Sequence, residues 1–369
     1  MLRRLTIGLF TLATAVVIAA CSSSDTSVPS SGGVPGIGPN FTTGTIYVSN
    51  GTQNAISIYS PSPGPSATPA YQIGGASTGL SGPQYLAFDS AKRLYVTNFN
   101  ASTSLASVQV YQTFATGNVI PFTTLTGASF ALTHPNGIAI DKTGEVVVAN
   151  TGGASPYSDS VRIIPTGLST ASPAPPFTVQ ATLGGSNTLM SAPTGVALDA
   201  AQNIYVANRG NGTVTVYAFP SPTPTPAATS TPVPTPTPST TPSPTPTPIP
   251  FAFNQPPIAR ITGLGAPTGI AVDSAGKIYV ADPDSGSPSV NVYNPIAGGT
   301  ATLAAQIKGA ATGLNFPSDV KVDNTGNIYV VDSAASKLFI FAPGANGNVT
   351  PTIAITYAGG TPVGIALSP

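Results

Sequence analysis

The chain has 369 residues, of which 41% are hydrophobic and only 7% are charged, with 12 basic side chains against 12 acidic ones. This balance, without a basic cluster, excludes nucleic acid and anionic membrane surfaces as predicted partners. A single cysteine excludes an internal disulfide and a cysteine-based metal site.

Residues 1–20 form a predicted lipoprotein signal peptide. Arg3 and Arg4 precede the apolar run Leu5–Val17, which is too short for a stable membrane span. The following Ile18–Cys21 resembles the bacterial lipobox, whose cysteine is lipidated and becomes the mature N-terminus. An ordinary cleaved signal and an uncleaved anchor are the alternatives. Lipidation is favoured because the only cysteine lies at the required position, and Ser22 after it favours the outer membrane in the Gram-negative sorting pattern it resembles.

A flexible tether is predicted for residues 21–43, because Ser22–Asn40 is rich in serine, glycine and proline and cannot bury enough apolar surface to fold. A repeat follows, with a period of roughly 50 residues. Its first segment is Pro-x-Gly followed by a short apolar run that ends in Asp. Five copies are present: Pro83–Asp89, Pro135–Asp141, Pro193–Asp199, Pro267–Asp273 and Pro317–Asp323.

Three further segments complete each unit. A short turn leads to a β-branched run ending in Asn or Asp, such as NIYVAN at 203–208. A variable loop then precedes an alternating strand, such as TVTVY at 213–217, and a weaker strand follows a proline-rich turn. Alternation, β-branching and flanking Gly, Asn and Asp indicate strands. We name these strands A to D in chain order, and the unit predicts an all-β fold with four antiparallel strands per repeat.

Self-similarity on this scale indicates a β-propeller. Gly44–Tyr59 contains strands B and C without a preceding strand A, and Thr361–Pro369 contains a strand A without a following strand B. The C-terminal strand A is therefore predicted to pair with the N-terminal strand B and to close a ring that spans residues 44–369. Counting the B strands predicts six blades. The Asp at the end of each strand A is expected to cap the A–B turn rather than to act in catalysis.

Residues 220–250 interrupt blade 4 with low-complexity Pro, Thr and Ser, which predicts extended polyproline II without a core. A stalk, with an O-glycan site, and a neutral expansion of a surface loop are both compatible with this composition. Alternating strand directions place the A–B and C–D connections on one face, the turn face, and the B–C and D–A connections on the other, the loop face. The tether and the insert are expected on the turn face, which leaves the loop face free for ligands.

The core P-x-G-[IV]-A-[IVL]-D…G-x-[IV]-Y-V-[AV]-[DN] resembles the NHL-repeat and gluconolactonase-like propellers. Lactonase-type members bind a divalent metal at the channel mouth through Glu, Asn and Asp, some of them at the x of P-x-G. That position holds Gln84, Asn136, Thr194, Thr268, Ser318 and Val363 here. Only Asn136 matches such a ligand and no carboxylate appears, so neither a metal site nor a cofactor is predicted.

Streptogramin-lyase-like propellers use paired histidines with a Glu as acid–base groups, whereas His134 is the only histidine here. We expect His134 to be a solvated loop residue or a single ligand contact. The ends of the B strands supply a second polar ring at Asn50, Asn98, Asn150, Asn208, Asp282 and Asp332. Local capping of the B–C loops is the favoured interpretation of this ring, and a polar rim for a ligand is the alternative.

Two functional hypotheses follow. The first is an envelope-anchored, non-enzymatic binding scaffold that faces the periplasm or the exterior and binds a protein or a small polar ligand on its loop face. Its membrane contact is the lipid on Cys21 alone. The second is a propeller hydrolase or lyase with a site at the channel mouth near Asn136 and His134. The best-formed positions of the repeated motif serve the fold, so any chemistry is expected where the copies differ from one another.

Overall fold

Short apolar runs become strands that are buried on both faces, as in β13 (Ile204–Asn208), whose five residues are all buried. The computed structural model describes residues 41–126, 130–152, 159–165, 181–219, 251–284, 286–357 and 360–369. The predicted signal peptide, most of the predicted tether and the Pro/Thr insert lie outside these residues. Within the described part of the chain, no helix has the length and apolar character needed to cross a membrane.

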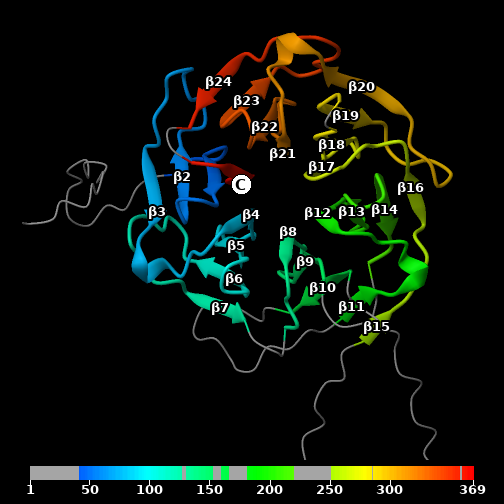
Figure 1. The fold of residues 1–369 in the computed structure, drawn as a ribbon, viewed down its shortest axis with the longest axis horizontal. Helices are drawn as coiled ribbons and strands as arrows, with labels where there is room; N and C mark the ends of the chain where they lie inside the picture. Colours follow the sequence, from blue (N-terminus) through cyan, green and yellow to red (C-terminus); the bar gives the residue numbers. More distant parts are fainter. Residues whose placement is uncertain are drawn as a thin grey trace, which may run out of the picture. The chain divides into compact units, whose positions relative to one another are not determined.

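Residues 41–369 contain six sheets arranged around a central axis, so the predicted six-bladed propeller is confirmed (Figure 1). Blade 1 contains β25 (Pro362–Leu367), β1 (Ile46–Asn50), β2 (Ala55–Tyr59) and β3 (Tyr71–Gly74). Blade 2 contains β4 (Pro83–Phe88), β5 (Leu94–Asn100), β6 (Leu105–Tyr111) and β7 (Thr123–Thr126). Blade 3 contains β8 (Pro135–Ile140), β9 (Val146–Asn150), β10 (Ser160–Ile164), β11 (Ala181–Gly184) and β15 (Phe251–Phe253).

The remaining three blades have four strands each. Blade 4 contains β12 (Pro193–Leu198), β13, β14 (Thr213–Tyr217) and β16 (Ala259–Ile261). Blade 5 contains β17 (Ile270–Val272), β18 (Ile278–Asp282), β19 (Ser289–Tyr293) and β20 (Leu303–Lys308). Blade 6 contains β21 (Pro317–Val322), β22 (Ile328–Asp332), β23 (Lys337–Phe341) and β24 (Ile353–Thr356).

The ring closes as predicted, through the pairing of β25 with β1. Tyr47 lies opposite Ala366, and Val48 lies opposite Ile365, in an antiparallel register. Gly44 N–H donates to the carbonyl of Ser368 at 2.8 Å, so the chain enters blade 1 on the turn face. The end of β14 lies on the same face, because Tyr217 pairs with Ile204 at the start of β13. The Pro/Thr insert follows shortly after this end.

Blade 3 departs from the predicted four-stranded antiparallel pattern. After the insert, β15 pairs in parallel with β11, with Ala181 opposite Phe251, before the chain forms β16 of blade 4. The insert therefore interrupts a connector that first follows the outer edge of the preceding blade. Isolated parallel bridges at Ile73–Gly117 and Ile307–Gly347 mark the same path in blades 2 and 6.

In blades 2, 4 and 6, the connection between strands C and D forms a hydrogen bond with a short 3₁₀ turn of the preceding blade. The turns are η1 (Ala76–Thr78), η2 (Ser186–Thr188) and η3 (Ala310–Thr312). Each follows a glycine with φ between 108° and 118°, a region that side chains rarely enter. Backbone amides of Ser77, Asn187 and Ala311 donate at 2.7–2.8 Å to the side-chain oxygens of Asn118, Asn254 and Asn348. The blades are thus organised in pairs, which the single-blade repeat does not predict.

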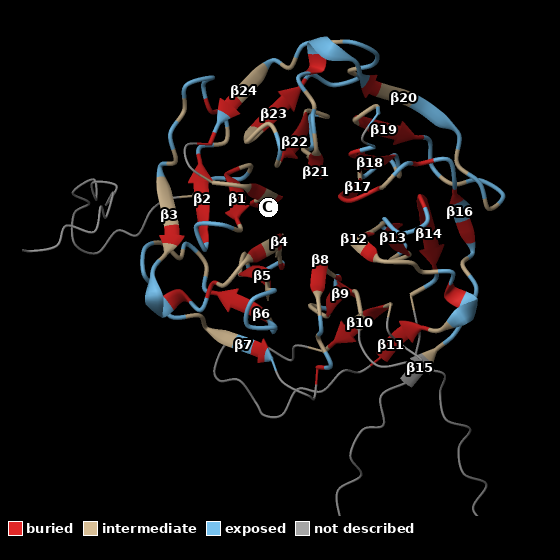
Figure 2. Ribbon diagram, in the orientation of Figure 1, coloured by how far each residue is buried: buried red, intermediate tan, exposed pale blue. Residues whose placement is uncertain are grey.

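Apolar side chains of adjacent blades form six core clusters, one at each blade boundary. Burial is concentrated on the inner strands, whereas outer strands such as β20 are partly exposed (Figure 2). The predicted turn caps are confirmed. Asp89, Asp141, Asp199, Asp273 and Asp323 each accept, through Oδ1, a backbone amide four residues later at 2.7–2.9 Å. In four of these blades a strand-B tyrosine hydroxyl donates to the same carboxylate at 3.1 Å.

Candidate functional site

Polar side chains at the x of P-x-G connect each inner strand to the next blade. Thr194 Oγ1 donates to the carbonyl of Pro267 at 3.0 Å, and Thr268 Oγ1 donates to that of Pro317 at 2.9 Å. Ser318 Oγ donates to the carbonyl of Val363 at 2.8 Å, and Asn136 Nδ2 approaches that of Pro193 at 3.4 Å. At four boundaries, therefore, the residues that the resemblance places at a metal site bind the neighbouring backbone.

The other two boundaries use strand B instead. Blade 1 has Val363 at the x position, and there Ser49 Oγ donates to the carbonyl of Gln84. In blade 2, Gln84 Nε2 turns back to the carbonyl of Gly82, and Thr97 Oγ1 donates to the carbonyl of Asn136 at 2.7 Å. Blades 3 to 6 have Ala or Val at the position of Ser49 and Thr97. Among the described residues, each blade thus has at least one side-chain donor to the next inner strand. Blade 3 has a second one, Thr151 Oγ1, which donates to the carbonyl of Pro193 at 2.7 Å.

The predicted ring at the ends of the B strands is buried, with exposures of 0–5%. Asn98, Asn150, Asn208, Asp282 and Asp332 accept backbone amides from the D–A loops, so they mainly hold those loops rather than the B–C loops. Asn50 caps its own B–C loop through the amide of Gln53. The two polar rings form internal hydrogen bonds, and ligand binding at their members stays a prediction.

His134 differs from the freely solvated residue that we expected. Its ring stacks on Phe99 with 3.5 Å between centroids and 20° between planes. This half-buried environment lowers the pKa of His134 through desolvation, so the neutral imidazole is favoured. Asn136 lies nearby in sequence, and its amide is bound to Thr151 Oγ1 and Pro193 O. Among the described residues, no group of three or more His, Cys, Asp or Glu side chains could hold a metal ion.

Arg209 is a cation of the loop face that is in neither ion pair found among the described residues. The guanidinium of Arg209, in the B–C loop of blade 4, lies 5.7 Å from the ring centroid of Phe316, in the D–A loop of blade 6. Arg209 is exposed, and Phe316 is half-buried. This pair brings a positive charge and an aromatic surface together on the loop face, where cation–π contact holds the guanidinium without neutralising it.

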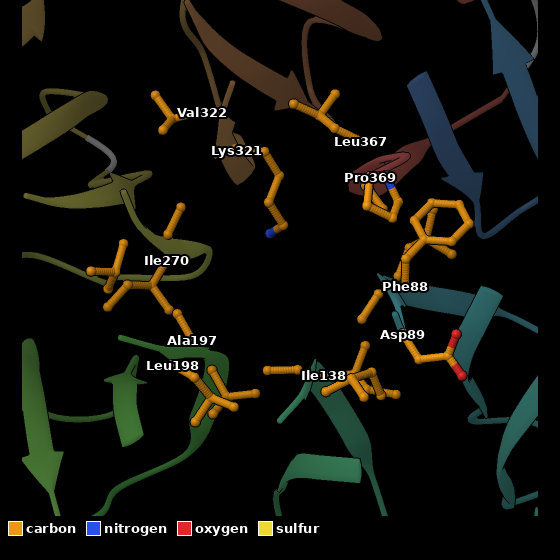
Figure 3. A pocket seen from close by; sticks show the side chains of 18 of the residues that line it. Phe88, Asp89, Ile138, Ala197, Leu198, Ile270, Lys321, Val322, Leu367 and Pro369 are labelled. Atoms are coloured by element: carbon orange, nitrogen blue, oxygen red, sulfur yellow. The ribbon is translucent and has the colours of Figure 1, made fainter. Parts of the chain in front are cut away.

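The structure contains a second candidate site on the opposite face, a cavity of 440 Å³ around the axis, which we call the cup. Its walls are the C-terminal halves of the six inner strands (Figure 3). Five of these strands place alanine in the wall at the fifth position of the strand-A motif: Ala87, Ala139, Ala197, Ala271 and Ala366. The sixth strand places Lys321 there. Small side chains at this level leave the axis open on the turn face.

Two departures from glycine lie next to the cup, on its loop-face side. Strand A has glycine two residues before the wall position in four blades, and a Cβ on Gly137 would lie 2.5 Å from the backbone of the next blade. Blades 2 and 6 have Tyr85 and Asp319 instead. Tyr85 is buried, and its hydroxyl donates to the carbonyl of Ser318 at 3.1 Å. Burial, with Asp319 nearby, raises the pKa of Tyr85 well above its ordinary value.

Lys321 is the cation of the cup. Its Nζ donates to both carboxylate oxygens of Asp319, at 3.0 and 3.1 Å, and to the carbonyl of Val320 at 3.2 Å. The Asp319 side chain is 1% exposed and that of Lys321 is 26% exposed. Burial raises the pKa of Asp319, while Lys321 and the amide of Ile365 act in the opposite direction. Figure 3 shows the Lys321 side chain projecting from its strand toward the centre of the cup.

The repeat pattern did not lead us to expect a site at the cup, although a signal was present. Tyr85, Asp319 and Lys321 are the residues that replace Gly, Gly and Ala in the strand-A motif. The expectation that chemistry lies where copies differ points to these positions. Their meeting at one level of the axis follows only from ring closure, because Tyr85 and Asp319 are 234 residues apart in the chain.

The fold defines the class of protein, a six-bladed β-propeller. The sequence profile of the NHL repeat matches residues 314–341, which confirms the predicted NHL-like character for this blade. No curated protein sequence matches the chain. A Bacteroides caccae protein of unknown function has a similar structure, with a TM-score of 0.56, 11% identity and coverage of 89% of this chain and 99% of its own. The periplasmic gluconolactonase of Pseudomonas aeruginosa is also similar, with a TM-score of 0.51, 14% identity and coverage of 88% and 99%.

Proposed function

We propose that the protein is an envelope-anchored, non-enzymatic binding scaffold that presents its loop face to a protein or a small polar ligand. The observation that carries this proposal is the use of the polar residues at the loop mouth. Asn136, Thr194, Thr268 and Ser318 bind the backbone of the next blade. A Thr or Ser hydroxyl has one proton to donate, and in Thr194, Thr268 and Ser318 that proton is already donated to a backbone carbonyl rather than to a substrate. The exposed Arg209 over Phe316 supports recognition on this face.

A hydrolase of the lactonase type is the alternative, favoured by Asn136 at a position that matches the resemblance and by the fold shared with a periplasmic gluconolactonase. Hydrolysis of glucono-δ-lactone, followed by pH-stat with and without added Ca²⁺, distinguishes the two hypotheses. We expect no rate above the buffer control. Turnover that Asn136→Ala abolishes, while the variant keeps the wild-type unfolding midpoint, would overturn the proposal.

Anchoring through Cys21 is part of the same proposal, with the outer membrane favoured in a Gram-negative cell. The Cys21→Ala variant is expected to leave the membrane fraction, whereas wild type stays there after a high-salt wash. Retention of the variant in the membrane would contradict lipid anchoring.

Recognition on the loop face can be tested in cells with a photo-crosslinking amino acid. Thr103 is exposed in the B–C loop of blade 2, and Ser274 is exposed in an A–B turn on the opposite face. We expect a discrete crosslinked product from position 103 and none from position 274. The reverse pattern would assign recognition to the turn face.

A further inference from the structure

We propose that the cup binds a linear organic carboxylate, with the apolar chain along the inner-strand walls and the carboxylate at Lys321. This site lies on the face opposite the loop mouth and does not depend on the proposed function. The cavity of 440 Å³ falls within the range of about 300–1,000 Å³ that is usual for small-molecule sites. Tyr85 and Asp319 lie two residues before the wall position of their strands, on the loop-face side of the cup, and a ligand enters from the turn face.

The wall selects an apolar body. Leu86, Ile138, Val196 and Ile270 line the cup next to the alanines, and Phe88 follows Ala87 in the wall. Figure 3 shows the side chains of Phe88, Ile138 and Ile270 around the cup. Water in such a cavity finds few partners, so displacing it with methylene groups is favourable. The alanine level admits a chain because no side chain longer than a methyl group, other than Lys321, projects from the strands there.

The charge in the wall selects the head group. Asp89, the one Asp or Glu among the described residues that line the cup, is bound to Arg93 Nε at 2.6 Å and to the hydroxyl of Tyr95 at 3.1 Å. Asp319 lies next to the cup, where the amides of Val320 and Ile365 and the ammonium of Lys321 surround its oxygens. The ammonium is therefore the charged group nearest to a bound molecule. A ligand carboxylate can replace the longest of its three contacts, the one to the carbonyl of Val320.

The assignment to a carboxylate rests on the position of Lys321 relative to its counter-ion. Asp319 neutralises the pair as a whole, but its carboxylate is 1% exposed whereas the side chain of Lys321 is 26% exposed. An anion at the cup axis can therefore contact the ammonium of Lys321 directly, whereas the carboxylate of Asp319 lies farther away, behind the ammonium. In a low-dielectric cavity this difference in distance favours a carboxylate over a hydroxyl.

Decanoate, below its critical micelle concentration, is the probe, and 1-decanol is its uncharged counterpart; binding to the full chain is measured by isothermal titration calorimetry. We expect one decanoate per chain and at least tenfold weaker binding of 1-decanol. The double variant Asp319→Gly/Lys321→Ala gives blade 6 the residues found at these positions in blades 3–5. It removes both charges without leaving either one buried and unpaired, and it should bind the two probes with affinities within threefold of each other.

Two further variants separate the cup from the rest of the turn face. Ala139 is partly exposed in the wall, and Ala139→Leu should abolish binding of both probes by filling the cup. Lys277 is an exposed cation in an A–B turn, and Lys277→Ala should bind decanoate as wild type does. Absence of decanoate binding to wild type, equal affinity for the two probes, or an equal loss in Lys277→Ala would overturn the proposal.

Discussion

The connection between neighbouring inner strands can be tested at Thr268, whose side chain is 5% exposed. Thr268→Val keeps the shape of the side chain and removes the hydroxyl that donates to Pro317 O at 2.9 Å. The lost hydrogen bond contributes about 1 kcal/mol, and leaving the buried carbonyl without a donor costs about 1 kcal/mol more. We expect the free energy of unfolding to fall by about 2 kcal/mol.

Blade 1 shows how the loss can be repaired, because it combines Val363 with Ser49 at the two positions. Adding Ala281→Ser to Thr268→Val recreates this combination in blade 5, with the new hydroxyl directed at the carbonyl of Ser318, which corresponds to Gln84 in blade 2, rather than at that of Pro317. We expect the second substitution to recover about 1 kcal/mol, although it would be neutral or unfavourable in wild type. A double-mutant cycle by urea denaturation, followed by circular dichroism, measures the coupling.

The control is Thr350→Val, at an exposed threonine in a connector of blade 6, which should change stability by less than about 0.5 kcal/mol. A loss below this limit in Thr268→Val would show that the connection between strands does not stabilise the ring. Equal effects of Ala281→Ser in both backgrounds would show that the two positions are not alternatives.

Three further outcomes follow from the described contacts. Lys321→Met should lower the free energy of unfolding by about 3 kcal/mol, because it leaves the carboxylate of Asp319 buried without its partner; the double variant Asp319→Gly/Lys321→Ala should recover most of this loss in the same urea titration. Asp323 is partly desolvated, which raises its pKa, but hydrogen bonds from Asn327 and Thr325 outweigh this effect and hold the pKa below 3.8. The ionised carboxylate therefore stabilises the fold above about pH 4, and this contribution is lost at lower pH. The difference in stability between wild type and Asp323→Asn should shrink as the pH falls below about 4. Gly137→Ala should destabilise by about 2 kcal/mol, because its Cβ would lie 2.5 Å from the backbone of the next blade, whereas Gly286→Ala, with no atom within 4 Å, should change the melting temperature little. A folded carboxylate that titrates near 3.8, or equal effects at the two glycines, would contradict these arguments.

The fold was predictable because its signals are local. Strand periodicity and the turn chemistry of Asp199 and its equivalents lie within short windows. The split blade is recognised from an incomplete repeat at each end of the chain. The first unit lacks strand A, and a strand A without a strand B stands at the C-terminal end. This pattern predicts ring closure, since two strand edges would otherwise be left unpaired. These signals predicted six blades and the pairing of β25 with β1, and both are confirmed.

The roles of individual polar residues were not predictable in the same way. Thr268 and Asn136 lie at the motif position for which the resemblance implied metal ligands, and only the neighbouring blade shows that they bind its carbonyls. The fastening of η1 by Asn118 likewise joins residues 41 positions apart. Such contacts depend on how adjacent sheets approach each other, and the pattern of one unit contains no information about that distance.

The sequence by itself determined the strands, the number of blades and the way in which the ring closes. The strands and blades depend on contacts within one repeat unit, and closure depends on pairing between the two ends of the chain. The tertiary structure decided what the exceptions do. Tyr85, Asp319 and Lys321 are three departures from the strand-A motif in two blades, and ring closure brings them to one level of the axis. There Lys321 supplies the positive charge of a cavity, and Tyr85 and Asp319 lie next to it, because strands that are distant in the chain converge on a common axis.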